Sequence, residues 1–169
     1  MPRLKWWYVS VIGMSLAVLV VLGTVLNSRI NNKAAGGTTA LRYLEVRDTD
    51  RGKLYHRWPV YDDGCFSIEF THSVHQSPVR ETFMVLGNEI KPKAVNFSSF
   101  GAGMQSHLEE GQKMQREGNS LVITGFEHSF KKLEYIVGTV SDHILYINGE
   151  VVSLKNICGK NAHITIRIK

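Results

Sequence analysis

A histidine, two serines and a glutamate stand close together in one short stretch of the sequence and could do chemistry. His72 and Ser73 are adjacent, and Glu81 follows a polar loop that contains Ser77. An imidazole that faces a carboxylate has its protonation tuned by that partner, which favours the charged form of both groups. These residue types could form a structural ion pair, a binding site for an anionic ligand or a partner protein, or part of a metal site.

The residues before and after the loop alternate between apolar and polar, which predicts two antiparallel strands joined as a hairpin. Pairing Phe70 with Phe83 makes an apolar stripe on one face and puts His72 opposite Glu81. Such a pair would raise the pKa of His72 and lower the pKa of Glu81. A slip by one residue would move Glu81 to the other face and destroy the pair.

A metal site would use His72, His75 and Glu81. The two histidines are three residues apart, so on an extended strand they face opposite ways and the loop would have to curl. Catalysis is disfavoured, because the neighbours His72 and Ser73 point to opposite faces and there is no G-x-S-x-G elbow or zinc-helix motif. We therefore expect no enzyme and no cofactor. More distant histidines that could add metal ligands are His107 and His128.

A second segment of interest is the glycine pair Gly101 and Gly103. Two glycines one residue apart allow positive backbone angles or the close approach of a ligand, but a plain bend from strand to loop is the favoured explanation. They are no dinucleotide fingerprint, because the third glycine is absent. The polar stretch 105–119 that follows is predicted to be a flap, either a short helix or a loop. The candidate binding residues are His72, Ser73, Ser77, Glu81, Ser99, Gly101, Gly103 and Met104.

Period-two alternation recurs along nearly all of residues 41–169, with turn residues at regular spacing. Asn148-Gly149 is the clearest hairpin turn. This pattern predicts an all-β domain, a sandwich or barrel of about eight to ten mostly antiparallel strands. Small polar residues over 30–40 predict a linker before it.

An N-terminal transmembrane helix is predicted within residues 1–29. Residues 6–28 carry no charge, and as a helix they would span roughly 34 Å, enough to cross a bilayer core of about 30 Å. Trp6, Trp7 and Tyr8 stand where an aromatic belt would lie. We favour an uncleaved signal anchor over a cleaved signal peptide or a buried helix, with a short basic tail inside and the domain outside.

The charge distribution argues against a nucleic-acid partner. The net charge is +5, but four basic residues flank the apolar run, and sixteen Lys and Arg face fifteen Asp and Glu from residue 40 onward. The two cysteines, Cys65 and Cys158, could form a disulfide in an oxidising compartment or remain two unpaired thiols. Neither belongs to a C-x-x-C pair, which disfavours a cysteine metal site.

Two motifs carry a resemblance to a known family. They are Phe70-Thr71-His72-Ser73-Val74 with Ser77-Pro78-Val79 and Glu81, and Ser99-Phe100-Gly101-Ala102-Gly103-Met104. The chain resembles, over about residues 41–155, an uncharacterised bacterial family of small exported β proteins that is encoded beside TRAP transporters of the TAXI subclass. Some members have a cysteine in the late hairpin, where this chain has Tyr146, so a family disulfide does not carry over. The resemblance implies a location and a transport context but no known reaction.

These observations together predict an extracytoplasmic accessory or binding protein, anchored by a single span in the bacterial cytoplasmic membrane. It would work with a TAXI-type TRAP transporter, with the transporter's membrane or solute-binding subunits as partners. One alternative is a metal-binding or hydrolytic domain at the membrane surface. The other is a structural envelope protein.

Overall fold

The computed structural model describes residues 41–72, 76–98 and 108–169, which belong to one compact unit that is almost entirely β. The predicted anchor over 1–29 and linker over 30–40 lie outside the described residues. Within the described ranges, no helix is long and apolar enough to cross a membrane.

Eleven strands and one short helix make up the described part of the chain. They are β1 (Arg42–Asp48), β2 (Leu54–Val60), β3 (Cys65–Thr71), β4 (Pro78–Leu86), β5 (Glu89–Phe97), β6 (Lys113–Glu117), β7 (Ser120–Thr124), β8 (Leu133–Ile136), β9 (His143–Ile147), β10 (Glu150–Ser153), α2 (Leu154–Cys158) and β11 (His163–Ile168).

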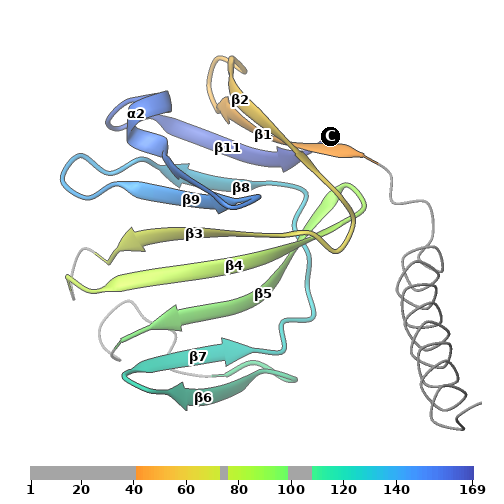
Figure 1. The fold of residues 1–169 in the computed structure, drawn as a ribbon, viewed down its shortest axis with the longest axis vertical. Coiled ribbons are helices and arrows are strands. Elements are labelled where there is room, and N and C mark those ends of the chain that lie inside the picture. The colour runs from red at the N-terminus through yellow and green to blue at the C-terminus, as the bar shows by residue number, and fades with distance from the viewer. Residues whose placement is uncertain (1–40, 73–75, 99–107) are drawn as a thin grey trace, which may run out of the picture. The chain divides into compact units, whose positions relative to one another are not determined.

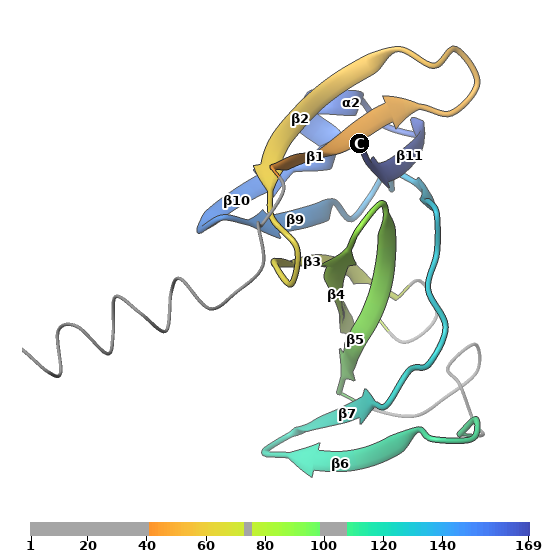
Figure 2. The ribbon, with the colours of Figure 1, turned by 90° about the vertical axis from the view of Figure 1, so that its right-hand side faces the viewer.

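The strands form two antiparallel sheets. The smaller sheet has the order β2-β1-β11-β8, and the larger has the order β10-β9-β3-β4-β5-β7-β6. Figures 1 and 2 show the smaller sheet beside β9 and β3, with the β6–β7 hairpin at the far end of the larger sheet. The chain thus folds back on itself, and β1 pairs with the C-terminal strand β11.

The main core lies between the two sheets. Leu44 and Ile166 from the smaller sheet, and Ile68 and Leu145 from the larger one, are fully buried in one apolar cluster. Period-two alternation explains this arrangement, since every second side chain of a strand points to the same face. A second apolar cluster gathers towards the β6–β7 end of the larger sheet, and its buried members are Val79, Phe97, Leu121 and Ile123.

Local sequence signals account for the turn and the helix near the C-terminus. Asn148 and Gly149 have φ values of 51° and 81°, as a tight hairpin between β9 and β10 requires, so that predicted turn is confirmed. The helix was not predicted. Ser153 ends β10 and caps α2, because its hydroxyl accepts a hydrogen bond from the Asn156 N–H at 3.0 Å. Asp142 accepts a further bond from the Lys155 N–H at 2.9 Å.

The predicted all-β class is confirmed, with more strands than expected. The additional strand, β6, lies inside the stretch 105–119, so the predicted flap is wrong for residues 113–117. The strand is at a sheet edge and only Met114 is partly buried. An edge strand with polar residues on both faces shows no period-two signal, which is why the sequence did not reveal it.

The core assignment predicts a large difference between two isoleucines in the smaller sheet. Ile166 is fully buried on β11, whereas Ile136 on β8 is 65% exposed. We expect Ile166→Ala to lower the unfolding free energy of the full-length protein by about 2–5 kcal/mol, because it leaves a cavity in the core. The matched change Ile136→Ala should stay within about 0.5 kcal/mol. Equal losses, measured by denaturant unfolding, would contradict this core.

Candidate functional site

The hairpin forms as expected but in a different register. Ile68 pairs with Glu81 and Phe70 pairs with Val79, so the predicted pairing of Phe70 with Phe83 is wrong by four residues. An even slip keeps every side chain on its predicted face, which is why alternation could not detect it. The tight connection decides the register, because Pro78 already pairs with Thr71 at the start of β4.

His72 therefore does not lie opposite Glu81. The His72 N–H donates to the Ser77 carbonyl at 2.9 Å, which closes the hairpin at the two candidate residues His72 and Ser77. The only hydrogen bond of the Glu81 side chain within the described ranges comes from another strand. The remaining candidates, Ser73, Ser99, Gly101, Gly103 and Met104, lie outside the described residues, as do His75 and His107.

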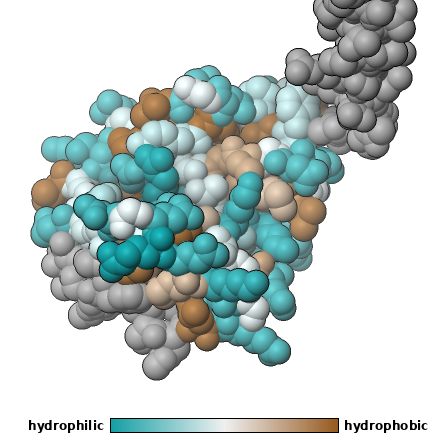
Figure 3. Space-filling model, turned by 60° about the horizontal axis from the view of Figure 1, so that its bottom comes forward, coloured by the Kyte–Doolittle hydropathy of each residue, from teal (hydrophilic) through white to brown (hydrophobic). Residues whose placement is uncertain are grey.

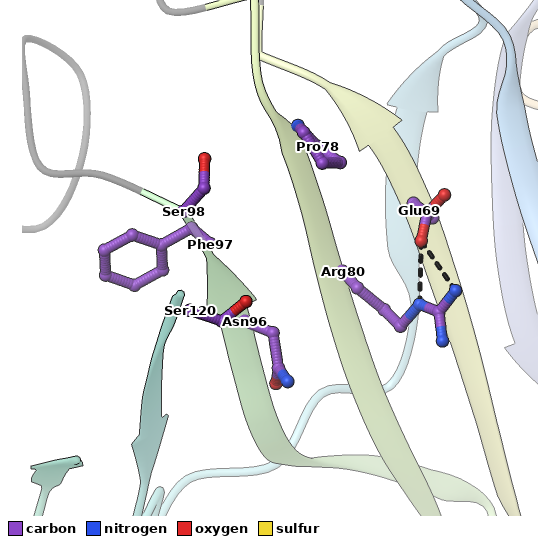
Figure 4. Close-up of a pocket in the computed structure, with 7 residues that line it drawn as sticks. All are labelled: Glu69, Pro78, Arg80, Asn96, Phe97, Ser98 and Ser120. Carbon is purple, nitrogen blue, oxygen red and sulfur yellow. Dashed lines mark hydrogen bonds and ion pairs between the residues drawn. The ribbon is translucent and has the colours of Figure 1, made fainter. Parts of the chain in front are cut away.

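Strand pairing brings together the parts of the two family motifs that the structure describes. Val79 at the start of β4 pairs with Phe97 at the end of β5. Pro78 and Ser98 then line one pocket of about 220 Å³, together with Glu69, Arg80, Asn96, Phe97 and Ser120 (Figure 4). We call this the outer-face pocket, because Glu69 and Arg80 point away from the core that lies between the sheets.

A charged pair marks the outer-face pocket. The Arg80 guanidinium contacts the Glu69 carboxylate at 2.7 Å, and both groups are drawn with their hydrogen bonds in Figure 4. The guanidinium also lies over the Tyr146 ring, 4.3 Å from its centroid. Because the pair is partly exposed, it adds little to the stability of the fold. Its planar guanidinium is better suited to binding a carboxylate or another planar group of a partner.

Glu81 points the other way, into the space between the sheets. The Tyr135 hydroxyl on β8 donates to Glu81 Oε2 at 2.6 Å, so this bond joins the smaller sheet to the larger one. Burial raises the pKa of Glu81 above its ordinary value, and the hydrogen bond from Tyr135 only partly opposes this. The predicted lowering of the Glu81 pKa is therefore wrong. The Tyr135 pKa is also raised, by burial first and by Glu81 next.

Aromatic rings hold Tyr135 in place. The His143 ring on β9 lies 5.7 Å from the Tyr135 ring and stacks on Phe70 at 5.2 Å. Burial lowers the pKa of His143, which favours the neutral imidazole, and its Nδ1 accepts the Gly138 N–H at 3.4 Å. These rings pack on Tyr135 without a charge that would compete for its hydroxyl, which donates to Glu81.

A groove of about 380 Å³ opens beside Glu81, and we call it the inner groove. Its lining comes from β4, β5, the segment 126–130 and β8. The residues are Glu81, Thr82, Phe83, Pro92, Ala94, Val95, Phe126, His128, Phe130, Leu133, Glu134 and Tyr135. Pockets of this size and largely apolar character are the usual form of small-molecule sites.

Sequence reasoning found Glu81 but missed its partner Tyr135 and the ring of His143 that packs on that tyrosine. Tyr135 and His143 lie in strands predicted only as core, and no local pattern links them to a residue more than fifty positions earlier. A tyrosine on an apolar face is itself a weak signal, since a buried phenol needs a hydrogen-bond acceptor.

The structure locates both cysteines and also bears on the predicted metal site. Cys65 is an exposed thiol at the start of β3, and Cys158 is a half-buried thiol in α2. Both are free in the structure, and burial raises the pKa of Cys158 to about 11. Across the described ranges, no three His, Cys, Asp or Glu side chains come together as a metal site would need.

Comparison with known proteins gives one match. Residues 66–154, just over half of the chain, match the family described as a domain of unknown function (DUF1850). No curated protein and no solved structure matches the chain. The matched region runs from β3 to the first residue of α2 and contains Glu81, Tyr135 and the outer-face pocket.

The hydrogen bond between Tyr135 and Glu81 predicts a clear loss of stability on its removal. We expect Tyr135→Phe to lower the unfolding free energy by about 1.5–3 kcal/mol, because it leaves a buried carboxyl group without its donor. The control is Tyr61→Phe, since Tyr61 is 53% exposed in a turn. Unfolding of the full-length protein in detergent measures both, and equal small losses would contradict the role of Tyr135.

The raised pKa of Glu81 predicts a pH-dependent stability. The folded state holds the Glu81 proton more tightly than the unfolded state, so this group's contribution is present at low pH. It is lost as pH rises from the unfolded value, about 4.3, through the folded one. Glu81→Gln has no such proton, so its unfolding free energy relative to the natural protein should rise over that window.

Unfolding measured at several pH values between 4 and 8 checks this expectation. Glu117→Gln, on the exposed edge strand β6, is the control and should show no such rise. A Glu81→Gln difference that stays constant, or falls as pH rises, would show that the carboxyl group is not held in its protonated form.

Proposed function

We propose that this chain, which belongs to the DUF1850 family, is a membrane-anchored accessory or binding protein outside the cytoplasm that works with a TAXI-type TRAP solute transporter. The uncharged run 6–28 supports the anchor, and the balanced charge of the domain is that of an ordinary protein-binding surface. The two motifs quoted above support the transport context.

The observation that carries this proposal is the meeting of the motif segments at one end of the larger sheet. Residues around Pro78 and Ser98 are about twenty apart in sequence, yet they line the same outer-face pocket. The pairing of β4 with β5 brings these segments together, and the pocket with its polar lining is what favours a binding role over a purely structural one. Polar residues at a shared pocket are what a binding site requires.

The face of the domain that Figure 3 shows favours polar recognition. In Figure 3, hydrophilic side chains predominate among the described residues, and hydrophobic ones appear in small separate patches. A partner would then be recognised through charge and shape, and the Glu69–Arg80 pair offers a guanidinium that is held in place by its carboxylate.

The test is affinity purification of the tagged full-length protein from its native membrane in mild detergent, followed by mass spectrometry. We expect the membrane or solute-binding subunits of a TRAP transporter to be recovered with it. Arg80→Glu should lower that recovery at least fivefold, because it reverses the charge in the outer-face pocket. Lys160→Glu makes the same charge change at an exposed position after α2 and should leave the recovery unchanged.

A charge swap separates binding from folding. The double variant Glu69→Arg/Arg80→Glu keeps an ion pair between β3 and β4, so it should restore stability but not recovery of the transporter. No transporter subunits with the natural protein, in a detergent that keeps the transporter intact, would contradict the proposal. If the recovery of transporter subunits changes only in step with the stability of each variant, the result would favour the structural envelope alternative.

A further inference from the structure

We propose that the inner groove binds an organic cation, a small protonated amine with an apolar body, through the carboxylate of Glu81. This inference is independent of the transporter and of the outer-face pocket, which lies on the opposite face of the same strands. It rests on four features of the groove: an open carboxyl oxygen, a lining without strong cations, a wall of aromatic rings and a fixed frame.

The first feature is that one oxygen of Glu81 remains available. Oε2 accepts the Tyr135 hydroxyl at 2.6 Å, and no other described group hydrogen-bonds to this carboxyl. No fully buried side-chain oxygen or nitrogen of the described residues lacks a partner. Oε1 is therefore not fully buried, and because Glu81 lines the inner groove, we expect a donor that enters the groove to reach this oxygen.

The second feature is the charge of the lining. Among the described residues, the groove is lined by two carboxylates and one imidazole but by neither Lys nor Arg. Glu134 is already paired with Lys132 at 2.7 Å, and His128 lies 4.0 Å from Glu109. Glu81 alone is left with a neutral partner, Tyr135. A ligand cation would supply the charge that this carboxylate lacks.

The third feature is a wall of aromatic rings that lines the same groove as Glu81. His128 stands between Phe126 and Phe130, with ring centroids 6.1 Å and 4.9 Å away, and all three line the groove together with Phe83. The negative face of an aromatic ring attracts a cation, and its area also covers an apolar body. Protonated amines satisfy both the ring faces and the carboxylate, whereas an anion would be repelled by Glu81.

The fourth feature is that backbone contacts hold the segment that carries these aromatic rings. This segment bonds to β5 through two backbone bonds between Ile90 and Phe130, each 2.8 Å long. Gly125 at its start has a φ of 84° and lies so close to the Gly111 carbonyl that any side chain would clash. A wall fixed at both places needs little ordering when a ligand binds.

Binding is coupled to a proton. A cation stabilises the ionised carboxyl group, so an ammonium ion that meets protonated Glu81 displaces its proton to solvent. Affinity should therefore rise as pH rises through the folded pKa of Glu81. The other titratable groups that line the groove are Tyr135, His128 and Glu134, and Glu109, His143 and Lys132 contact these lining residues.

The experiment is calorimetric titration of the full-length protein in detergent with benzylamine, with benzyl alcohol as the uncharged probe of the same shape. Benzylamine should bind at least tenfold more tightly than benzyl alcohol, and its affinity should increase from pH 5 to pH 8. Putrescine and tetramethylammonium extend the test to a slender diamine and to a cation without a donor.

The variants separate the carboxylate from the wall. Glu81→Gln should weaken benzylamine at least tenfold and abolish the pH dependence, while Phe130→Ala should weaken it about two- to fivefold. Phe130 is 38% exposed, so its loss is compatible with a folded domain. Glu117→Gln on β6 removes an exposed carboxylate and should leave the affinity unchanged.

Two results would overturn the inference. One is equal affinity for benzylamine and benzyl alcohol, or full affinity in a folded Glu81→Gln variant, since the groove would then be an apolar site that does not use the carboxylate. The other is the failure of all three cations to bind at millimolar concentration to protein with a native unfolding transition. Loss of binding in Glu81→Gln counts only where its circular dichroism matches the natural protein.

Discussion

The hydrogen bond from Tyr135 to Glu81 is the contact that ties the polar chemistry of this domain to its fold. It connects β8, at the edge of the smaller sheet, to β4 in the middle of the larger one. Apolar packing fills most of the space between the sheets, and Trp58 on β2 adds a second polar link by donating to Glu150 Oε2 on β10 at 3.2 Å. A hydrogen bond of 2.6 Å constrains both position and angle more narrowly than apolar contact does. The pairing of β8 with β11 sets its place in the smaller sheet, and the bond from Tyr135 fixes it over β4.

The same contact carries an energetic cost that packing alone would avoid. A carboxyl group on the inner face of a sheet loses water, and a phenol restores only one of its hydrogen bonds. An apolar pair of the same shape would stabilise the fold more readily. We therefore read Glu81 and Tyr135 as a specific feature of the inner groove, which they line together with several aromatic side chains.

Much of the fold follows from local pattern, and much of the site does not. Alternation predicted the strands, and Asn148-Gly149 predicted the hairpin turn because positive φ values need such residues. Alternation could not choose between registers that differ by an even number, so the pairing of His72 with Glu81 was wrong although the face of Glu81 was right. β6 was missed because an exposed edge strand has no apolar face, and Tyr135 because contacts between sheets leave no mark in local sequence.

The ionisation of Glu81 is the most direct test of this account. A full-length protein labelled with ¹³C at its glutamate carboxyl groups allows the Glu81 resonance to be assigned by its loss in Glu81→Gln and titrated in detergent by NMR. We expect a midpoint above that of an ordinary glutamate, about 4.3, and we expect it to fall when an amine occupies the groove. A midpoint at or below the ordinary value in the free protein would contradict the picture of a desolvated carboxyl group held by Tyr135.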